Sequence, residues 1–112
     1  MREEFICEVT ADGASPRLRL AGEFDLAAAE AVQKELASVM SSNPKALVVD
    51  LHGVTFIDST GLQVLTQLHN AAEADGLKLW ITRGEGEVER VLRITGLDTV
   101  LPLVDRVPDA AA

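Results

Sequence analysis

The chain contains a single cysteine and two histidines, and this scarcity limits the chemistry that it can perform. One cysteine excludes a disulfide within the chain and fits a reducing compartment. Cys7, His52 and His69 lie far apart in the sequence and show none of the spacings of a metal site. The sequence therefore predicts neither an internal disulfide nor a bound metal ion.

Long apolar runs are absent as well, since none approaches the roughly 18 residues that cross a membrane. The first residues, MREEFICEVT, carry acids where a secretory signal has a basic region followed by an apolar stretch. No glycine-rich loop ends in the Gly-Lys-Ser/Thr of a phosphate-binding loop, and the GEG at residues 84–86 is too short to count as one. We therefore expect a cytoplasmic protein with no membrane contact and no cofactor.

Positive charge is the third shortage, because 10 Lys and Arg residues stand against 18 Asp and Glu residues, giving a net charge of −8. A nucleic-acid-binding face needs clustered cations that release counterions from the phosphates. The nearest approach to such a cluster lies between residues 83 and 93, where arginines alternate with glutamates as on a solvated helix face. The sequence predicts no direct nucleic-acid partner.

What the chain does have is the size and apolar content of one packed domain. Its 112 residues are 47% hydrophobic and 25% charged, which is enough for one core and too short for two. We expect a single domain over residues 4–104. The remaining DRVPDAAA, residues 105–112, is charged, contains proline and ends in alanines, and is expected to be a flexible tail.

Hydrophobic spacing predicts alternating strands and helices. Alternation over residues 4–10 and 17–22, joined by the turn sequence ADGASP, indicates a hairpin-like pair of strands. The unbroken apolar run at Ala46–Leu51 is typical of a central strand covered on both faces. LKLWIT, residues 77–82, predicts a further strand, and VLPLV at 100–104 allows a short last one.

Three segments with helical spacing lie between these strands. Asp25 can cap the first, which ends before Pro44 because the residue preceding a proline is pushed out of the helical region. The second follows an expected loop at residues 52–58 and ends at Gly76, a predicted C-cap, while the third covers about Glu85–Thr95.

The order β-β-α-β-α-β-α, with room for a fifth strand, predicts an α/β fold. Strand-helix-strand units return the chain in the same direction, so the later strands should run parallel. We expect a mixed four- to five-stranded sheet, with three to four helices that cover at least one of its faces.

The stretch FIDSTGLQVL at residues 56–65 holds more polar groups than a helix start needs. Asp58 alone can supply the N-cap, which leaves Ser59 and Thr60 as surplus hydroxyls. An acyl-transfer enzyme needs a base beside its serine. His69 lies about 15 Å down the same helix, and the G-x-S-x-G elbow that could use His52 fails at the residue before Asp58.

Ser59 fits better as an acceptor of phosphate. It lies at a strand-to-helix connection, where side chains are accessible, and the unpaired N–H groups and positive dipole end of the helix should stabilise a phosphoryl group. A phosphoryl group adds about −1.5 to −2 of charge beside Asp58. A docked partner would have to desolvate or repel that charge, so phosphorylation is expected to act as a switch.

Four segments together resemble a known family. LAGEFD at residues 20–25, ALVVDL at 46–51, FIDSTGL at 56–62 and RITGL at 93–97 are similar, in order and spacing, to the STAS domain of bacterial anti-sigma-factor antagonists. The resemblance spans about residues 4–104. It implies a single STAS domain with the STAS fold.

The resemblance also implies a partner-switching function. In that family the serine at the position of Ser59 is phosphorylated by the anti-sigma factor, which is an ATP-dependent serine kinase. The unphosphorylated antagonist binds the anti-sigma factor and frees the sigma factor for transcription regulation, and a separate phosphoserine phosphatase restores it. The antagonist is thus a substrate and not an enzyme.

By the same resemblance, Asp25 should lie near the phosphoacceptor and contribute to the partner surface, and Asp58 should flank Ser59. The neighbouring exposed turn would comprise Thr60, Gly61 and Gln63. Two alternatives remain: a STAS scaffold or accessory subunit of a stress-signalling or lipid-transport complex, and a small serine hydrolase that uses Ser59 and His52.

Overall fold

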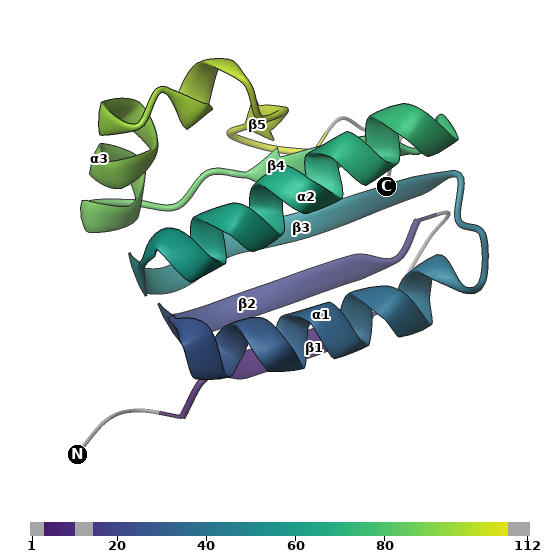
Figure 1. Ribbon diagram of the computed structural model, residues 1–112, viewed down its shortest axis with the longest axis horizontal. Coiled ribbons are helices and arrows are strands. Elements are labelled where there is room, and N and C mark those ends of the chain that lie inside the picture. The colour runs from purple at the N-terminus through teal and green to yellow at the C-terminus, as the bar shows by residue number, and fades with distance from the viewer. Residues whose placement is uncertain (1–3, 11–14, 108–112) are drawn as a thin grey trace.

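The computed structural model describes residues 4–10 and 15–107 of the chain and forms one α/β unit (Figure 1). Over these residues the strands and helices follow the predicted order, with five strands in one sheet and three α-helices. Their bounds are β1 Ile6–Thr10, β2 Arg17–Phe24, α1 Leu26–Met40, β3 Ala46–Ile57, α2 Ser59–Asp75, β4 Lys78–Thr82, α3 Glu87–Ile94, the 3-10 turn η1 Leu97–Thr99, and β5 Leu103–Val104.

The sheet is mixed, and its strands lie in the order in which they occur in the sequence. β1 pairs with β2 antiparallel, and every later neighbouring pair, from β2·β3 to β4·β5, is parallel. The expectation of an α/β fold with parallel later strands is therefore confirmed, as is the central position of the strand that begins at Ala46.

The third strand is longer than predicted. Residues 52–57, expected to be a loop, continue β3 to Ile57, and β2 pairs with them up to Phe24. The register of the pair shifts between Arg19 and Ala21 and again between Gly22 and Glu23. The pairing continues after each shift, so β2 and β3 end side by side at Phe24 and Ile57. A helix follows each strand directly from this edge.

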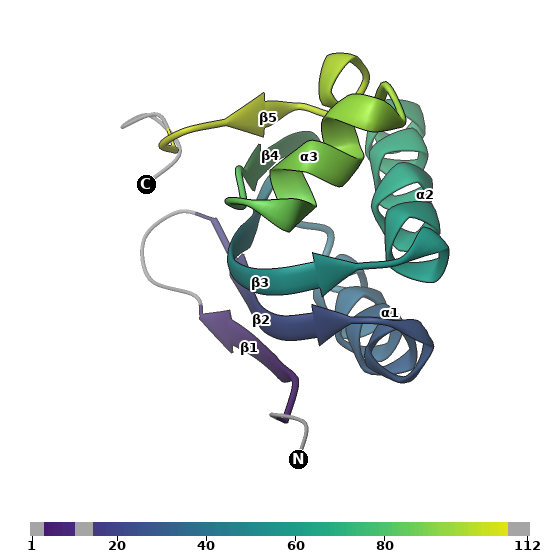
Figure 2. The same cartoon turned by 90° about the vertical axis from the view of Figure 1, so that its left-hand side faces the viewer.

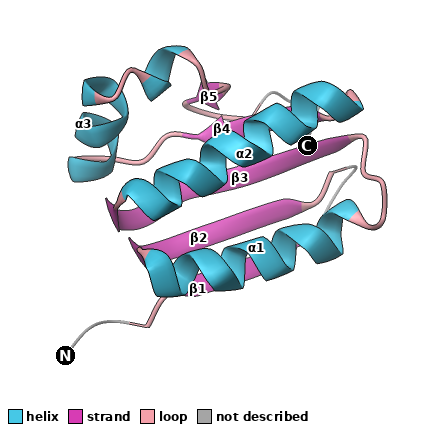
Figure 3. Ribbon diagram, in the orientation of Figure 1, coloured by secondary structure: helices cyan, strands magenta, loops and turns pink. Residues whose placement is uncertain are grey.

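Two helices cover one face of the sheet. α1 and α2 lie side by side in one layer over the strands (Figure 3), and turning the molecule places both on the same side of the sheet (Figure 2). The core between the layers is built mainly from aliphatic side chains, among them Leu18, Leu20, Val49, Leu65 and Ile81. α3 packs against β3 through the buried Val88 and Leu92.

The chain ends and the first turn lie partly outside the described residues. Residues 11–14 of the expected hairpin turn and 108–112 of the expected tail are among those not described. Residues 105–107 of that tail are described, and Val107 is buried against Val48. No helix among the described residues has the length and apolar character required to span a membrane.

Cys7 lies in β1 and is partly buried against the core. Burial, followed by the nearby Glu35 carboxylate, raises the pKa of the thiol to about 11. At neutral pH this thiol is protonated, so it is a weak nucleophile.

Candidate functional site

The candidate site lies at the carboxyl ends of β2 and β3, where the two strands finish next to each other. Phe24 and Ile57 are paired in the sheet, and the N–H of Asp58 donates to the Phe24 carbonyl at 3.3 Å. From this edge the chain enters α1 in one case and α2 in the other (Figure 1). In open α/β sheets ligands and partners meet the carboxyl ends of the strands, so this edge is a favourable place for a functional site.

Each helix starts with an aspartate as its N-cap. Asp25 has φ −110° and ψ −168°, and its carboxylate accepts from the Ala28 N–H at 3.1 Å. Asp58 has φ −106° and ψ −174°, and one oxygen of its carboxylate accepts from the N–H groups of Thr60 at 2.9 Å and Gly61 at 3.0 Å. Both caps that the sequence predicted are therefore confirmed, and the two turns share one backbone geometry.

Ser59 is the first residue of α2 and is exposed. Because Asp58 caps the helix, the serine hydroxyl has no part in the cap, and it donates to none of the described residues. A hydroxyl that is exposed and has no structural hydrogen bond is available for reaction with an incoming group.

The helix start offers a phosphoryl group fewer donors than the sequence suggested. Of the four N–H groups that a helix start leaves free, three have acceptors here: Asp58 donates to Phe24, and Thr60 and Gly61 donate to the Asp58 carboxylate. The expectation that unpaired N–H groups stabilise the phosphoryl group is wrong for these donors. The dipole remains, but it is already partly neutralised by the Asp58 carboxylate.

The remaining predicted site residues fall into an exposed set and a buried one. Asp25, Asp58 and Thr60 are partly exposed, and Gln63 is exposed one turn into α2. Gly61 is buried, so the prediction that it belongs to an exposed turn is wrong. A Cβ at Gly61 would lie 2.8 Å from the Phe24 carbonyl oxygen and 2.8 Å from Ile57 Cγ1, so this glycine lets α2 approach the sheet.

Neither histidine can act as a base for Ser59. His52 lies in β3, and the seven residues from there to Ser59 span about 20 Å of extended chain. The His52 ring is exposed and lies 3.9 Å from a Glu85 oxygen, while His69 lies 3.8 Å from Glu73 further along α2. Within the described part of the chain neither histidine forms a nucleophile–base pair with Ser59, which argues against the serine hydrolase.

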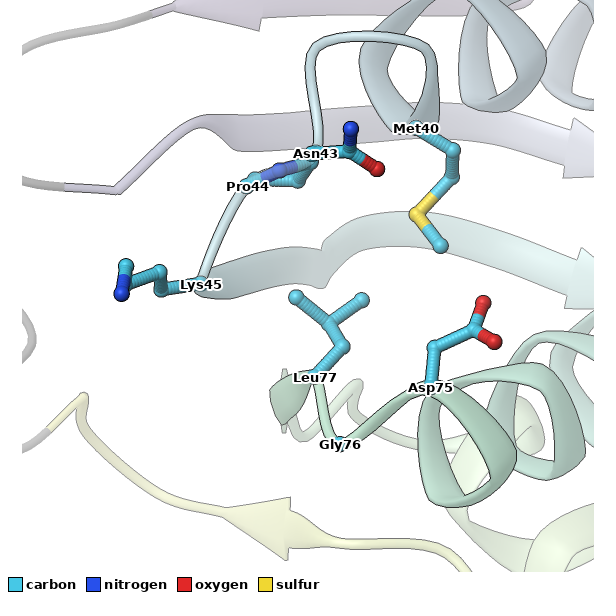
Figure 4. Close-up of a pocket in the computed structure, with 7 residues that line it drawn as sticks. All are labelled: Met40, Asn43, Pro44, Lys45, Asp75, Gly76 and Leu77. Carbon is cyan, nitrogen blue, oxygen red and sulfur yellow. The ribbon is translucent and has the colours of Figure 1, made fainter.

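The described residues contain no group of three or more His, Cys, Asp or Glu side chains that could hold a metal ion. A pocket of about 620 Å³ lies at the other end of the molecule, between the C-terminal ends of α1 and α2 (Figure 4). Seven residues line it: Met40, Asn43, Pro44, Lys45, Asp75, Gly76 and Leu77. This pocket is therefore separate from the edge that carries Ser59.

These features define a class: a small α/β domain with helices on one face of a mixed sheet and an exposed serine behind a capping aspartate. The sequence profile described as "Mlab, STAS domain" matches residues 7–105. The chain belongs to the STAS-domain family.

Named relatives agree with this family assignment. The anti-sigma-F factor antagonist RsfB of Mycobacterium tuberculosis is 31% identical over 93 residues, which cover 83% of this chain and 75% of that protein. An anti-sigma factor antagonist from Mycobacterium paratuberculosis has a solved structure that matches with a TM-score of 0.83 and 27% identity, covering 96% of this chain and 91% of that one.

The anti-sigma factor antagonist SpoIIAA shares the fold at lower identity. Its unphosphorylated form matches with a TM-score of 0.77 and 18% identity, over 95% of this chain and 92% of that one. Its phosphorylated form, described as a Bacillus cell fate determinant, matches with a TM-score of 0.72 and 17% identity, over 95% of this chain and 96% of that one. The predicted STAS fold is therefore confirmed.

Proposed function

We propose that this protein is an anti-sigma-factor antagonist whose partner binding is switched off by phosphorylation of Ser59. The names of RsfB and of the Mycobacterium paratuberculosis structure support the antagonist role. The partner is an anti-sigma factor with serine kinase activity, and a phosphoserine phosphatase resets the switch. Such partners place the protein in the cytoplasm.

The observation that supports this proposal most strongly is that Asp58, and not Ser59, caps α2. Asp58 supplies the cap hydrogen bonds, while Ser59 is exposed and its hydroxyl makes no hydrogen bond with any described residue. Modification of Ser59 therefore leaves the helix start intact. The switch then acts on the surface and not on the stability of the fold.

The reaction is a phosphoryl transfer in which this chain is the substrate. The Ser59 oxygen attacks the γ-phosphorus of ATP held by the kinase, the bond to the β,γ-bridging oxygen breaks, and ADP leaves. A base of the kinase takes the hydroxyl proton. Hydrolysis of the phosphoserine by the phosphatase consumes water and releases inorganic phosphate, which restores the serine.

Electrostatic repulsion and desolvation explain why the phosphorylated protein dissociates from its partner. The phosphoryl group brings about −1.5 to −2 of charge next to the Asp58 carboxylate. The N–H groups of Thr60 and Gly61 already donate to Asp58, so they do not neutralise the new charge. A penalty of about 3 kcal/mol for desolvating that charge in the interface lowers affinity roughly a hundredfold.

The alternative is an accessory STAS subunit of a stress-signalling or lipid-transport complex. The description "Mlab, STAS domain" of the matching profile keeps this alternative in consideration. The two candidates differ in what they require of Ser59, because the antagonist has to accept phosphate from an anti-sigma-type kinase and the accessory role does not require it.

The test is incubation of the protein with ATP and each anti-sigma-type kinase encoded in the same genome. Intact-mass spectrometry should find one added phosphate with the cognate kinase, lost in Ser59→Ala and retained in Thr60→Val. Failure to accept phosphate from every such kinase would contradict the proposal and favour the accessory subunit.

A further inference from the structure

Leu26, the first residue of α1, is 64% exposed. The other large apolar side chains of this helix face the core, where Val32 and Leu36 are buried. A leucine at this position therefore contributes little to the stability of the free protein. Its apolar surface lies at the edge that carries Ser59 and is open to a docked partner.

Leu26 has the same place in its helix as Ser59 has in α2. Each directly follows a capping aspartate, and the two caps have nearly the same backbone angles. Their strands are paired in parallel, and the helices pack side by side on one face of the sheet. The two side chains therefore leave the same edge on the same side, separated by about the 8–10 Å between packed helices.

An interface centred on Ser59 has to include Leu26. A specific protein–protein interface buries about 800 Å² on each partner, which corresponds to a patch roughly 30 Å across. A partner that brings its active site to Ser59 therefore covers a position about 10 Å away. Leucine there is either buried in an apolar pocket of the partner or clashes with a polar surface.

We propose that Leu26 is a docking residue, inserted into an apolar pocket of the kinase partner, and that it selects which kinase binds. This inference rests on the proposed function. Ser59 is the part of the surface that changes on phosphorylation, and Leu26 is a part that does not change. The chain thus combines an apolar contact for recognition with a hydroxyl for switching.

The charges of the edge favour this partner over a second copy of the chain. A symmetric dimer through this edge would place the same patch of both copies face to face. Asp58 of one copy would then approach Asp58 of the other, in a protein of net charge −8. Like charges across an interface oppose binding, so the occupant is a different protein.

The test compares Leu26→Gln with Val9→Thr in binding to the kinase that phosphorylates the wild-type protein. Val9 is 39% exposed and pairs with Leu18, about 20 Å along β2 from Phe24. Loss of one apolar contact should weaken the complex about tenfold in isothermal titration calorimetry. Val9→Thr should bind within about twofold of wild type, the range expected for a residue outside the interface.

Phosphorylation kinetics separate docking from chemistry. Because Leu26 does not touch the reacting atoms, Leu26→Gln should raise KM about tenfold and leave kcat unchanged. Its thermal unfolding midpoint should equal that of wild type, since the side chain is exposed.

Unchanged affinity in Leu26→Gln would overturn the docking role alone. A wild-type protein that binds none of the kinases would overturn the proposed function together with it. Sedimentation of the isolated protein tests whether a second copy of the chain binds at Leu26. A dimer that Leu26→Gln dissociates would show that it does and would overturn the kinase-docking role.

Discussion

The two strand-to-helix turns of this domain are built alike and are used differently. Phe24–Asp25–Leu26 and Ile57–Asp58–Ser59 each consist of a buried residue that ends a strand, a capping aspartate and an exposed first helical residue. They differ at the exposed position, where one turn has leucine and the other has serine. The comparison indicates that the fold fixes where a side chain emerges, while the residue there determines its chemistry.

A second difference lies two residues further into each helix. The third helical residue is Ala28 in α1 and Gly61 in α2, and both are buried. Alanine fits in α1, whereas a Cβ at Gly61 would press on the Phe24 carbonyl. The missing side chain at Gly61 therefore lets the start of α2 lie against the end of β2, next to Ser59.

The largest expected effect comes from exchanging the two exposed residues. The double variant Leu26→Ser with Ser59→Leu moves the hydroxyl by about the 8–10 Å between helices. Phosphoryl transfer needs the reacting atoms about 3–3.5 Å apart, so phosphate incorporation should fall to the level of Ser59→Ala. Intact-mass spectrometry after incubation with the kinase measures this.

The single variant Leu26→Ser is the matched control for the exchange, because it keeps Ser59 and should still accept one phosphate. Circular dichroism should find both variants folded. Phosphate located at position 26 of the double variant would show that the kinase accepts a serine at the start of either helix. The proposed functional difference between the two turns would then be contradicted.

Gly61→Ala should have the next largest effect. In an ordinary helix this change stabilises by about 1 kcal/mol, but here the added methyl has to displace the Phe24 backbone or Ile57. We expect the free energy of unfolding to fall by about 2 kcal/mol. Urea unfolding followed by fluorescence of the single tryptophan, Trp80, gives the value.

The reciprocal change, Ala28→Gly, should also destabilise, by about 1 kcal/mol, since glycine is the poorer helix former. Each turn would then tolerate only its own residue at this position. A Gly61→Ala protein as stable as wild type would show that the two helix starts are interchangeable, against the packing described above.

Much of the fold could be predicted because its signals are local. The aspartate caps, the break before Pro44 and the positive φ of 69° at Gly76 all follow from the conformational preferences of single residues. The second half of β3 was missed because its burial recurs at Leu51, Val54 and Ile57 instead of alternating. Register shifts against β2 break the alternation by which a strand is recognised.

The candidate site could be predicted in its chemistry but less well in its packing. Asp58 and Ser59 are identified by residue type and order, and the structure brings them to one edge with Asp25. The burial of Gly61 leaves no trace in a hydrophobic pattern because glycine has no side chain. Leu26 lies three residues before Ala29, so helical spacing would assign it to the buried stripe, yet at the first position of α1 it is exposed.

The central claim is that phosphorylation of Ser59 releases the partner without unfolding the domain. The most direct test is calorimetric titration of the anti-sigma factor with the protein before and after stoichiometric phosphorylation at Ser59. The account predicts an affinity at least about a hundredfold lower for the phosphorylated protein, with an unchanged circular dichroism spectrum. Equal affinity of the two forms would contradict it.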